Sequence, residues 1–486
     1  MPRRIQAALI ALLTLGLIKI GITQSSTTAP ARKFSKEDAS YVAYDEPVIA
    51  FTNIQLVDGT GSAPKQDVTV LVKDGRITAI VPAGRLKPPA GATIIDGHGK
   101  TLLPGFVMVH EHMFYPSTRQ GAYFQLPYSF SRLYLAGGTT TMRTAGTLSP
   151  DADLNVRRAI DAGRQPGPDI DVTGPYLGGP SEEIPMLPRL SGPEDAARIV
   201  NFWADEGVHS FKAYTQITRA ELKAAIDAAH AHGLKVTGHL CSVTYREAAD
   251  LGIDNLEHDF EVLTDFVPDK KPDVCPPFPV TLSSIARIDP DGPQIGDLMD
   301  YLIARKVALT STLAIFETLA GGAPKAPVAA LELLTPQLRT FYEQTWSAMQ
   351  STPFAKTNAG LLPNLVRMQR RFVRKGGLLM AGTDPTGFGG VIPGFSARRQ
   401  LELMVQGGFP FPEALQICTL NGARFLGRDS DVGSVQVGKR ADLLLIDGDP
   451  VADLTALQRM SYVFKAGVGY RTQAIFDALR GKVGLY

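Results

Sequence analysis

The alternation of apolar and polar residues indicates β structure near the start of the chain. Runs from Ile49 to Val57, Val68 to Val72 and Arg76 to Val81 have the two-residue period of half-buried strands. The last two runs flank a short Lys-Asp-Gly segment, and an Asp-Gly pair between alternating runs is typical of a β-hairpin. We therefore expect this region to form a sheet.

The pattern then changes to β runs alternating with helical stretches, of which Ala220 to His232 is a clear example. Thr218 and Glu221 before it have the spacing of a capping box. Eight candidate strands occur in this region, and eight βα units favour a closed (β/α)8 barrel of the TIM type. The candidates are Gly105 to His112, Thr139 to Thr144, Asp169 to Gly174, His209 to Tyr214, Lys235 to Leu240, Asn255 to Phe260, Ala308 to Leu313 and Leu378 to Asp384.

β patterns return after the barrel, from Ala441 to Ile446 and from Tyr462 to Val468. These runs and the N-terminal ones flank the barrel, so periodicity permits one small β-sandwich built from both chain ends. The predicted α/β chain therefore has a first sandwich part at residues 48–103, the barrel at 104–433 and a second sandwich part at 434–486.

The first residues differ in kind from the rest. Arg3 and Arg4 precede an apolar run from Ala7 to Ile18, which is typical of a signal peptide. The run is shorter than the roughly 18 to 20 residues that a membrane-spanning helix needs, although an uncleaved anchor is an alternative. We expect a signal peptide at residues 1–31, with cleavage near Ala29 and Ala31, and a linker at 32–47. The expected location is the periplasm or the outside of the cell.

Composition excludes several classes of protein. The formal net charge is +1 over 486 residues, so nothing in it favours nucleic acid or an anionic membrane as a partner. Apolar residues make up 44% and charged residues 20%, as in folded globular proteins. The three cysteines provide no CxxC pair for a metal. The expected partner is a small-molecule substrate, with a homo-oligomer as an option.

Four of the eight histidines lie where predicted barrel strands end. His110 and His112 end the first strand, and a two-residue spacing points both at the barrel interior. His239 ends the fifth strand and His258 lies near the end of the sixth. The carboxyl ends of barrel strands form the active-site face. We therefore expect these imidazoles to bind metal there.

Lys212 on the fourth strand and Asp384 at the end of the eighth project toward the same face. Burial lowers the pKa of a lysine, and a neutral lysine can be modified. By alternation, Glu257 and Asp259 should point away from the barrel interior. Cys241 could be a thiolate ligand, but a small buried apolar role is the stronger expectation.

The chain resembles the amidohydrolase superfamily, and within it secreted relatives of imidazolonepropionase and Xaa-Pro dipeptidase. The resemblance covers about residues 46–486. It is carried by Pro104–His112 (PGFVMVHEH), Gly137–Arg143, Gly238–His239, Glu257–His258, Gly382–Pro385 (GTDP), Asn421–Leu426 and Gly438–Leu443. The glutamate between His110 and His112 departs from the commonest pattern. The resemblance implies the sandwich, which periodicity only permitted.

The resemblance also implies two divalent metal ions bridged by a carboxylated Lys212. His110, His112 and Asp384 would bind the first ion, and His239 and His258 the second. Zinc is expected, with manganese or cobalt possible, because imidazole and carboxylate ligands select weakly among these metals. The ions would share a hydroxide that attacks a carbonyl. Asp384 would carry its proton to the leaving amine, as the catalytic residue.

Loops after the strands should supply specificity. Phe114, Tyr115 and the segment from Phe388 to Phe395 are candidates, although loop aromatics are usually packing residues. Arg143 or Tyr214 could hold a substrate carboxylate, or Arg143 could pair with an internal carboxylate. The proline-rich segment from Val267 to Pro279 either covers the barrel mouth or forms an interface.

Three functions remain open. The first is a binuclear hydrolase that cleaves the amide bond of a small N-acyl amino acid or a dipeptide-like substrate. The second is a mononuclear cyclic-amide hydrolase or deaminase, in which Lys212 has a structural role. The third is a non-catalytic assembly protein on the same scaffold. A complete set of metal ligands argues against the third, because buried polar groups are costly to keep without use.

Overall fold

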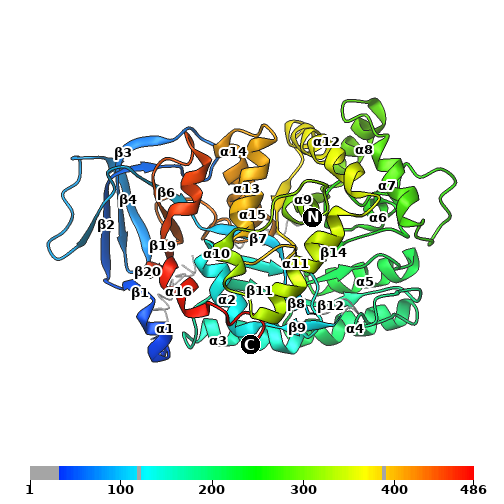
Figure 1. Cartoon of the computed structure of the whole chain (residues 1–486), viewed down its shortest axis with the longest axis horizontal. Helices are drawn as coiled ribbons and strands as arrows, with labels where there is room; N and C mark the ends of the chain where they lie inside the picture. Colours follow the sequence, from blue (N-terminus) through cyan, green and yellow to red (C-terminus); the bar gives the residue numbers. More distant parts are fainter. Residues whose placement is uncertain (1–31, 118–121, 386–389, 486) are drawn as a thin grey trace, which may run out of the picture.

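The computed structural model describes residues 32–117, 122–385 and 390–485 of the chain. A sheet lies at one end of the molecule, and a barrel surrounded by helices forms the rest (Figure 1). The predicted signal peptide and its cleavage site lie outside the described residues. Among the described residues, no helix has the length and apolar character needed to cross a bilayer.

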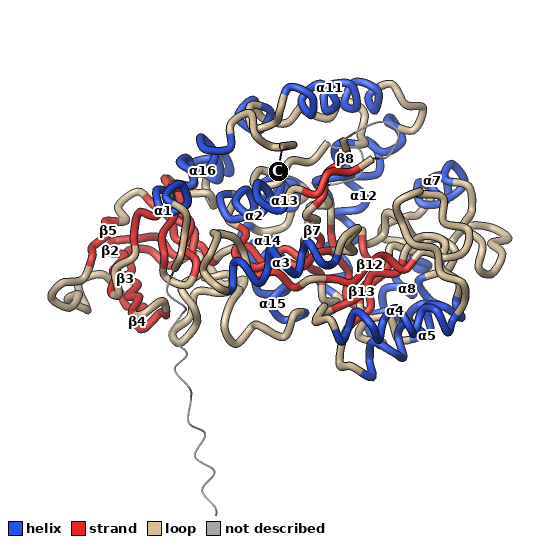
Figure 2. Tube along the Cα trace, turned by 90° about the horizontal axis from the view of Figure 1, so that it is seen from below, coloured by secondary structure: helices blue, strands red, loops and turns tan. Residues whose placement is uncertain are grey.

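Both chain ends contribute strands to a nine-stranded sheet, in the order β1-β20-β19-β18-β6-β2-β3-β4 with β5 paired to β2. Figure 2 shows this sheet beside the barrel. That it forms a two-layer sandwich stays a prediction. Its strands are β1 (Val42–Tyr44), β2 (Val48–Leu56), β3 (Lys65–Lys73), β4 (Arg76–Pro82), β5 (Thr93–Asp96), β6 (Lys100–Pro104), β18 (Leu443–Asp447), β19 (Met460–Lys465) and β20 (Val468–Arg471).

The predicted hairpin joins β3 and β4. Asp74 and Gly75 have φ of 48° and 75°, the left-handed values that a tight hairpin turn requires. A Cβ at Gly75 would lie 2.6 Å from the carbonyl oxygen of Ala466. Glycine therefore serves both the turn and its close packing against the C-terminal strands.

The predicted linker at residues 32–47 is wrong in part. Helix α1 (Lys36–Ser40) and strand β1 form there, and β1 pairs antiparallel with β20. Asp38 is buried and accepts two hydrogen bonds from Arg132, at 2.8 and 2.7 Å. The polar composition of this segment concealed its order, because a buried ion pair holds the helix in place of an apolar face.

All eight predicted barrel strands are present. They form a three-stranded sheet, β7-β10-β11, and a six-stranded sheet, β12 to β17, and the parallel pairing within each follows chain order. The third expected strand is divided after Asp171, and several others are shorter than expected. The barrel strands are β7 (Phe106–Glu111), β10 (Thr139–Thr144), β11 (Asp169–Asp171) with β12 (Thr173–Leu177), β13 (Ser210–Ala213), β14 (Lys235–Gly238), β15 (Asn255–Glu257), β16 (Ala308–Ser311) and β17 (Leu379–Ala381).

Two junctions join the sheets into the barrel. Between β10 and β12, the Thr173 amide donates to Thr144 Oγ1 at 2.8 Å. Between β17 and β7, the amides of Thr383 and Asp384 each donate to the carbonyl oxygen of His110 at 3.1 Å. A Cβ at Gly382 would lie 2.2 Å from that of His110, so only glycine permits this approach.

Helices follow the barrel strands, and the capping box predicted at Thr218 and Glu221 is confirmed. A short hairpin of β8 (Phe114–Pro116) and β9 (Tyr123–Gln125) follows the first strand. The helices are α2 (Pro127–Ala136), α3 (Pro150–Asp161), α4 (Pro193–Asp205), α5 (Arg219–Ala231), α6 (Tyr245–Leu251), α7 (Phe278–Ala286), α8 (Pro293–Ala304), α9 (Leu313–Thr318), α10 (Val328–Leu331), α11 (Pro336–Gln350), α12 (Ala355–Arg374), α13 (Ser396–Gln406), α14 (Phe411–Gln416), α15 (Gly422–Phe425) and α16 (Thr472–Leu479), with a π-helix at Ile417–Asn421 and a 3-10 helix at Leu454–Arg459.

A cluster of charges links the barrel to the C-terminal part of the chain. Asp169 on β11 binds Arg428, Arg440 and Lys465, the Arg440 Nη2 atom lying 2.7 Å from its carboxylate. These cations hold the pKa of Asp169 well below its usual range, although burial alone would raise it. The sheet is thus joined to the barrel by ion pairs as well as by packing.

Candidate metal centre

The six predicted metal ligands gather at the carboxyl ends of the barrel strands. His110 lies on β7 and Lys212 on β13, while His112, His239, His258 and Asp384 follow directly or closely after the ends of four strands. His110, His112, Lys212 and His258 are buried, and His239 and Asp384 are half-buried. The placement agrees with the rule that barrel active sites form at this face.

The side chains of these residues meet around Asp384. Its carboxylate lies 3.7 Å from His110 Nε2, 3.4 Å from His112 Nε2 and 3.8 Å from His258 Nε2. Lys212 Nζ lies 3.1 Å from His110 Nε2. The rings of His239 and His258 are 4.5 Å apart between centroids. The structure therefore brings all six side chains into one group.

One nitrogen of each of three histidines is occupied by a partner outside the group. His110 Nδ1 donates to Glu257 Oε2 at 2.7 Å, and His112 Nδ1 donates to the carbonyl oxygen of Gly146 at 3.1 Å. His258 Nδ1 lies 2.7 Å from Thr312 Oγ1. Metal-binding histidines are usually oriented in this way, which directs the Nε2 lone pairs to the centre.

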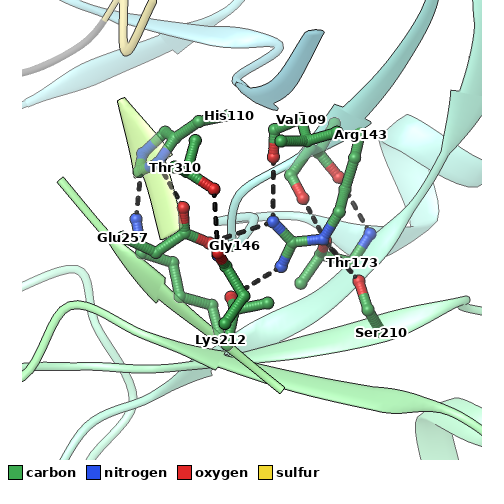
Figure 3. Close-up of polar contacts among 12 residues, drawn as sticks. Val109, His110, Arg143, Gly146, Thr173, Ser210, Lys212, Glu257 and Thr310 are labelled. Carbon is green, nitrogen blue, oxygen red and sulfur yellow. Dashed lines mark hydrogen bonds and ion pairs between the residues drawn. The ribbon is translucent and has the colours of Figure 1, made fainter. Parts of the chain in front are cut away.

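Glu257 is the principal site residue that sequence reasoning missed. The prediction that it points away from the barrel interior is wrong: its carboxylate is fully buried between His110 and Arg143 (Figure 3). Strand β15 ends at Glu257, and His258 follows in a left-handed conformation with φ of 65°. That reversal breaks the alternation, so both adjacent side chains reach the site. The Glu-His pair was the available signal.

Arg143 lies next to Glu257 and is fully buried (Figure 3). Its guanidinium donates to Glu257 Oε1 at 3.0 Å, to the carbonyl oxygen of Val109 at 2.9 Å, to Ser210 Oγ at 2.9 Å and to Thr237 Oγ1 at 2.8 Å. Of the two roles that the sequence left open for Arg143, the structure shows the pairing with an internal carboxylate, that of Glu257. Its role is to hold Glu257, which holds His110.

Burial dominates the protonation of the group. It lowers the pKa of His112 to about 4, of His239 to about 3 and of Lys212 to about 8. Burial alone would raise the pKa of Asp384, but His110, His112 and His258 hold it well below its usual range. Neutral imidazoles beside an ionised carboxylate are the protonation states that metal binding requires.

Asp384 and His258 both have left-handed backbone conformations, with φ of 49° and 65°. Such conformations cost on the order of 1–3 kcal/mol for residues other than glycine and cluster at functional sites. His258 directly follows the short strand β15, and Asp384 lies three residues after the end of β17. The backbone of the site is therefore strained in a way that the fold maintains.

A cavity of about 590 Å³ opens at the candidate metal group, since His112, Lys212, His239, His258 and Asp384 line it. Phe114, Tyr176 and Tyr214 line one part of it, and Tyr214 contacts His239 with ring centroids 5.1 Å apart. Tyr115 is buried in the main hydrophobic core, where its ring packs against Phe130 of α2. Of the predicted segment from Phe388 to Phe395, residues 388 and 389 lie outside the described residues, and Phe395 packs against Phe476.

The proline-rich segment lies at the cavity, since Cys275, Pro276 and Phe278 line it. Cys275 forms a disulfide with Cys241, two residues after His239. The expectation that Cys241 is a small buried apolar residue is therefore wrong. Its partner is distant in the sequence and lies in a segment without periodicity, so spacing gave no sign of the bond.

A barrel whose strand ends carry a histidine- and aspartate-rich group able to hold a metal is the arrangement of a class of barrel enzymes. The model of the Amidohydrolase family matches residues 101–469, and the chain belongs to that family. Membership places the chain among hydrolases of carbon–nitrogen bonds.

Individual relatives are more distant. Imidazolonepropionase of Stenotrophomonas maltophilia is 30% identical over 107 residues, which are 21% of this chain and 26% of that protein. Enamidase of Eubacterium barkeri is 37% identical over 94 residues, 19% of this chain and 24% of that protein. The chain thus matches about a quarter of the length of these curated relatives. A candidate prolidase from Bifidobacterium longum has a similar structure, with a TM-score of 0.64 and 25% identity, covering 89% of this chain and 98% of that one.

Proposed function

We propose that the protein is a binuclear metal-dependent hydrolase that cleaves the amide bond of a small N-acyl amino acid or dipeptide-like substrate. One observation carries the proposal. Donor atoms of His110, His258 and Asp384 lie within 4.8 Å of one another, with Lys212, His112 and His239 directly beside them.

The residues present fit the metal ions that the family implies. His258 Nε2 is buried and has no hydrogen-bond partner among the described residues, which is costly unless a ligand completes it. The donor set of imidazole nitrogens and a carboxylate suits zinc, with manganese or cobalt as alternatives. His110, His112 and Asp384 would hold one ion, and His239 and His258 the other. The lowered pKa of Lys212 supports carboxylation of its amine, which would give this side chain the oxygen atoms that a metal ligand offers.

When bound, the ions supply a Lewis acid for the substrate carbonyl and lower the pKa of a water molecule. The chain supplies the rest. Asp384 takes the proton of the attacking water on its carboxylate and delivers it to the leaving nitrogen. Its lowered pKa keeps it ionised and ready to accept that proton. Arg143 and Glu257 fix His110, so that the site needs little rearrangement during the reaction.

The cavity supports a substrate with an apolar or aromatic part. Phe114, Tyr176 and Tyr214 offer ring faces close to the metal group. Solved structures similar to this one include a Xaa-Pro dipeptidase and an ochratoxinase, and a curated relative is an N-substituted formamide deformylase. We infer a small amide with a bulky substituent. The disulfide supports the proposal that the protein is exported to the periplasm or beyond.

Metal content per chain tests the proposal most directly. Elemental analysis should find about two ions in the wild-type protein and one or none in Lys212→Ala. Arg339→Ala, an exposed change on α11, should match the wild type. Hydrolysis of N-acyl amino acids and dipeptides would then be assayed in parallel. One ion per chain, unaffected by Lys212→Ala, would instead favour the mononuclear alternative and redirect the assays to cyclic amides and deamination.

A further inference from the structure

The wall of the cavity carries polar groups that the metal group does not use. Glu261 follows the sixth barrel strand, lines the cavity and is 8% exposed. Among the described residues, its carboxyl group makes no hydrogen bond or ion pair, and its Oε2 atom is fully buried. It does not belong to the cluster that could hold a metal. An unpartnered buried carboxyl is costly and therefore needs a reason.

Asn358 on α12 lines the same cavity and is 4% exposed. Its Nδ2 group donates to the carbonyl oxygen of Leu319 at 3.2 Å, which identifies Oδ1 as the acceptor atom. That Oδ1 atom is buried and lacks a partner among the described residues. The hydroxyl oxygen of Thr281, on the neighbouring helix α7, also lines the cavity, is buried and lacks a partner among the described residues.

The rest of this wall is apolar. Val262 adjoins Glu261 in sequence, Leu282 and Ile285 come from α7, and Phe354 directly precedes α12. The rings of Phe278 and Phe354 meet at 5.4 Å and join the two helices at the cavity. The polar groups are therefore surrounded by apolar side chains. In ligand cavities, a few polar groups in such surroundings fix the orientation of the ligand and provide specificity.

We propose that Glu261 and Asn358 form a substrate subsite that binds an N–H group, an ammonium or an amide, carried by the apolar part of the substrate. Both offer acceptor atoms, and acceptors select a hydrogen-bond donor. The charged residues that line the described cavity are Lys212, Glu261 and Asp384, of which two belong to the metal group. Burial raises the pKa of Glu261 well above its usual range, and a bound ammonium would favour the ionised carboxylate, whereas a bound carboxylate would oppose it.

The inference rests on the proposed function and narrows it. Of the two substrate classes, it selects dipeptide-like amides with a free amine or an N–H on the apolar part. Discrimination should be large, because a buried polar group that loses its ligand partner stays unpaired. The subsite lies apart from the metal cluster, so its binding preference can be measured without turnover.

The test is the binding of three matched probes to the full-length mature protein, measured by ligand-observed NMR. The probes are 2-phenylethylamine, 3-phenylpropanamide and 3-phenylpropanoate, which share the aromatic body and differ in the terminal group. The two N–H probes should bind at least about tenfold more tightly than the carboxylate. The comparison of amine with amide decides which N–H group the subsite prefers.

Glu261→Leu should remove the preference for the N–H probes, and Glu261→Gln, which keeps an acceptor oxygen, should retain the preference for the amide over the carboxylate. Glu343→Gln, an exposed change on α11, is the control and should behave as the wild type. Thermal unfolding of each variant confirms that it folds. Equal binding of the three probes, tighter binding of the carboxylate, no binding of the N–H probes, or an unchanged preference in Glu261→Leu would each overturn the proposal. Absence of metal or hydrolysis would instead count against the proposed function alone.

Discussion

At the scale of single residues, sequence reasoning could locate the candidate ligands but not the residues that hold them in place. His110, His112, His239, His258, Lys212 and Asp384 were predicted because strand ends meet at one face of a barrel. Glu257 could not be predicted by alternation, since the left-handed backbone of His258 lets the side chains of Glu257 and His258, which are neighbours in sequence, both reach the site. The backbone conformation of one residue therefore determines the direction of the Glu257 side chain, and a two-residue period does not encode that conformation.

Glu257→Gln tests the support of His110. The neutral amide loses the charge that Arg143 and His110 both contact, so metal affinity should fall by about 10- to 100-fold. Competition with a chelator measures that affinity. Glu402→Gln is a suitable control, because Glu402 pairs with Arg399 and Gln458 outside the site. An unchanged affinity in Glu257→Gln would contradict the supporting role.

Asp384→Asn separates proton transfer from metal binding. The amide oxygen can still contact an ion, but it cannot accept the proton, so turnover should fall by about 10²- to 10⁴-fold while metal content is retained. Steady-state kinetics with the best substrate found, at matched metal content, measures the effect. Wild-type activity in this variant would remove Asp384 from proton transfer.

At the scale of elements, the strands were predictable and the segments between them were not. Each strand has a recognisable pattern of apolar residues in the sequence, whereas the proline-rich segment has no hydrophobic periodicity. Its place at the cavity depends on the Cys241–Cys275 disulfide, on Lys270, which donates to the carbonyl oxygen of Ser242 at 2.6 Å, and on Arg219, which pairs with Asp273 at 3.0 Å. These are long-range contacts that local patterns do not encode.

The double substitution Cys241→Ser and Cys275→Ser tests this anchoring. The disulfide closes a loop with a sequence separation of 34, and the chain-entropy model assigns about 3 to 4 kcal/mol to such a loop. The free energy of unfolding should fall by about that amount in denaturant titrations. A reducing agent should have the same effect on the wild type and none on the double variant. Equal stability of oxidised wild type and variant would contradict the prediction.

At the scale of the whole molecule, the barrel and the contribution of both chain ends were predicted, and the electrostatic connection between them was not. Asp169 on β11 meets Arg428, Arg440 and Lys465, which lie far along the chain. Such a cluster leaves no periodic signal, because each charge is an isolated position in its own segment. Only the folded arrangement identifies it.

Asp169→Asn should destabilise the protein by about 3 kcal/mol at neutral pH, because three cations lose their common partner. The pKa of Asp169 is lowered in the folded state, so its contribution is complete above its unfolded pKa of about 4 and declines as pH falls below it. Denaturant titrations from pH 8 to pH 3 measure the difference between variant and wild type. A constant difference over the whole range would contradict the assignment.

The arrangement of the nine-stranded sheet also bears on when the protein can fold. β6 pairs with β18, and β1 pairs with β20, so two early strands wait for partners from the end of the chain. While the ribosome is still making the barrel, both strands expose backbone groups that only the last segments will cover. The sheet can therefore be completed only after synthesis of its last strands. A chain that stops before them would leave strand edges unpaired and free to pair with other chains.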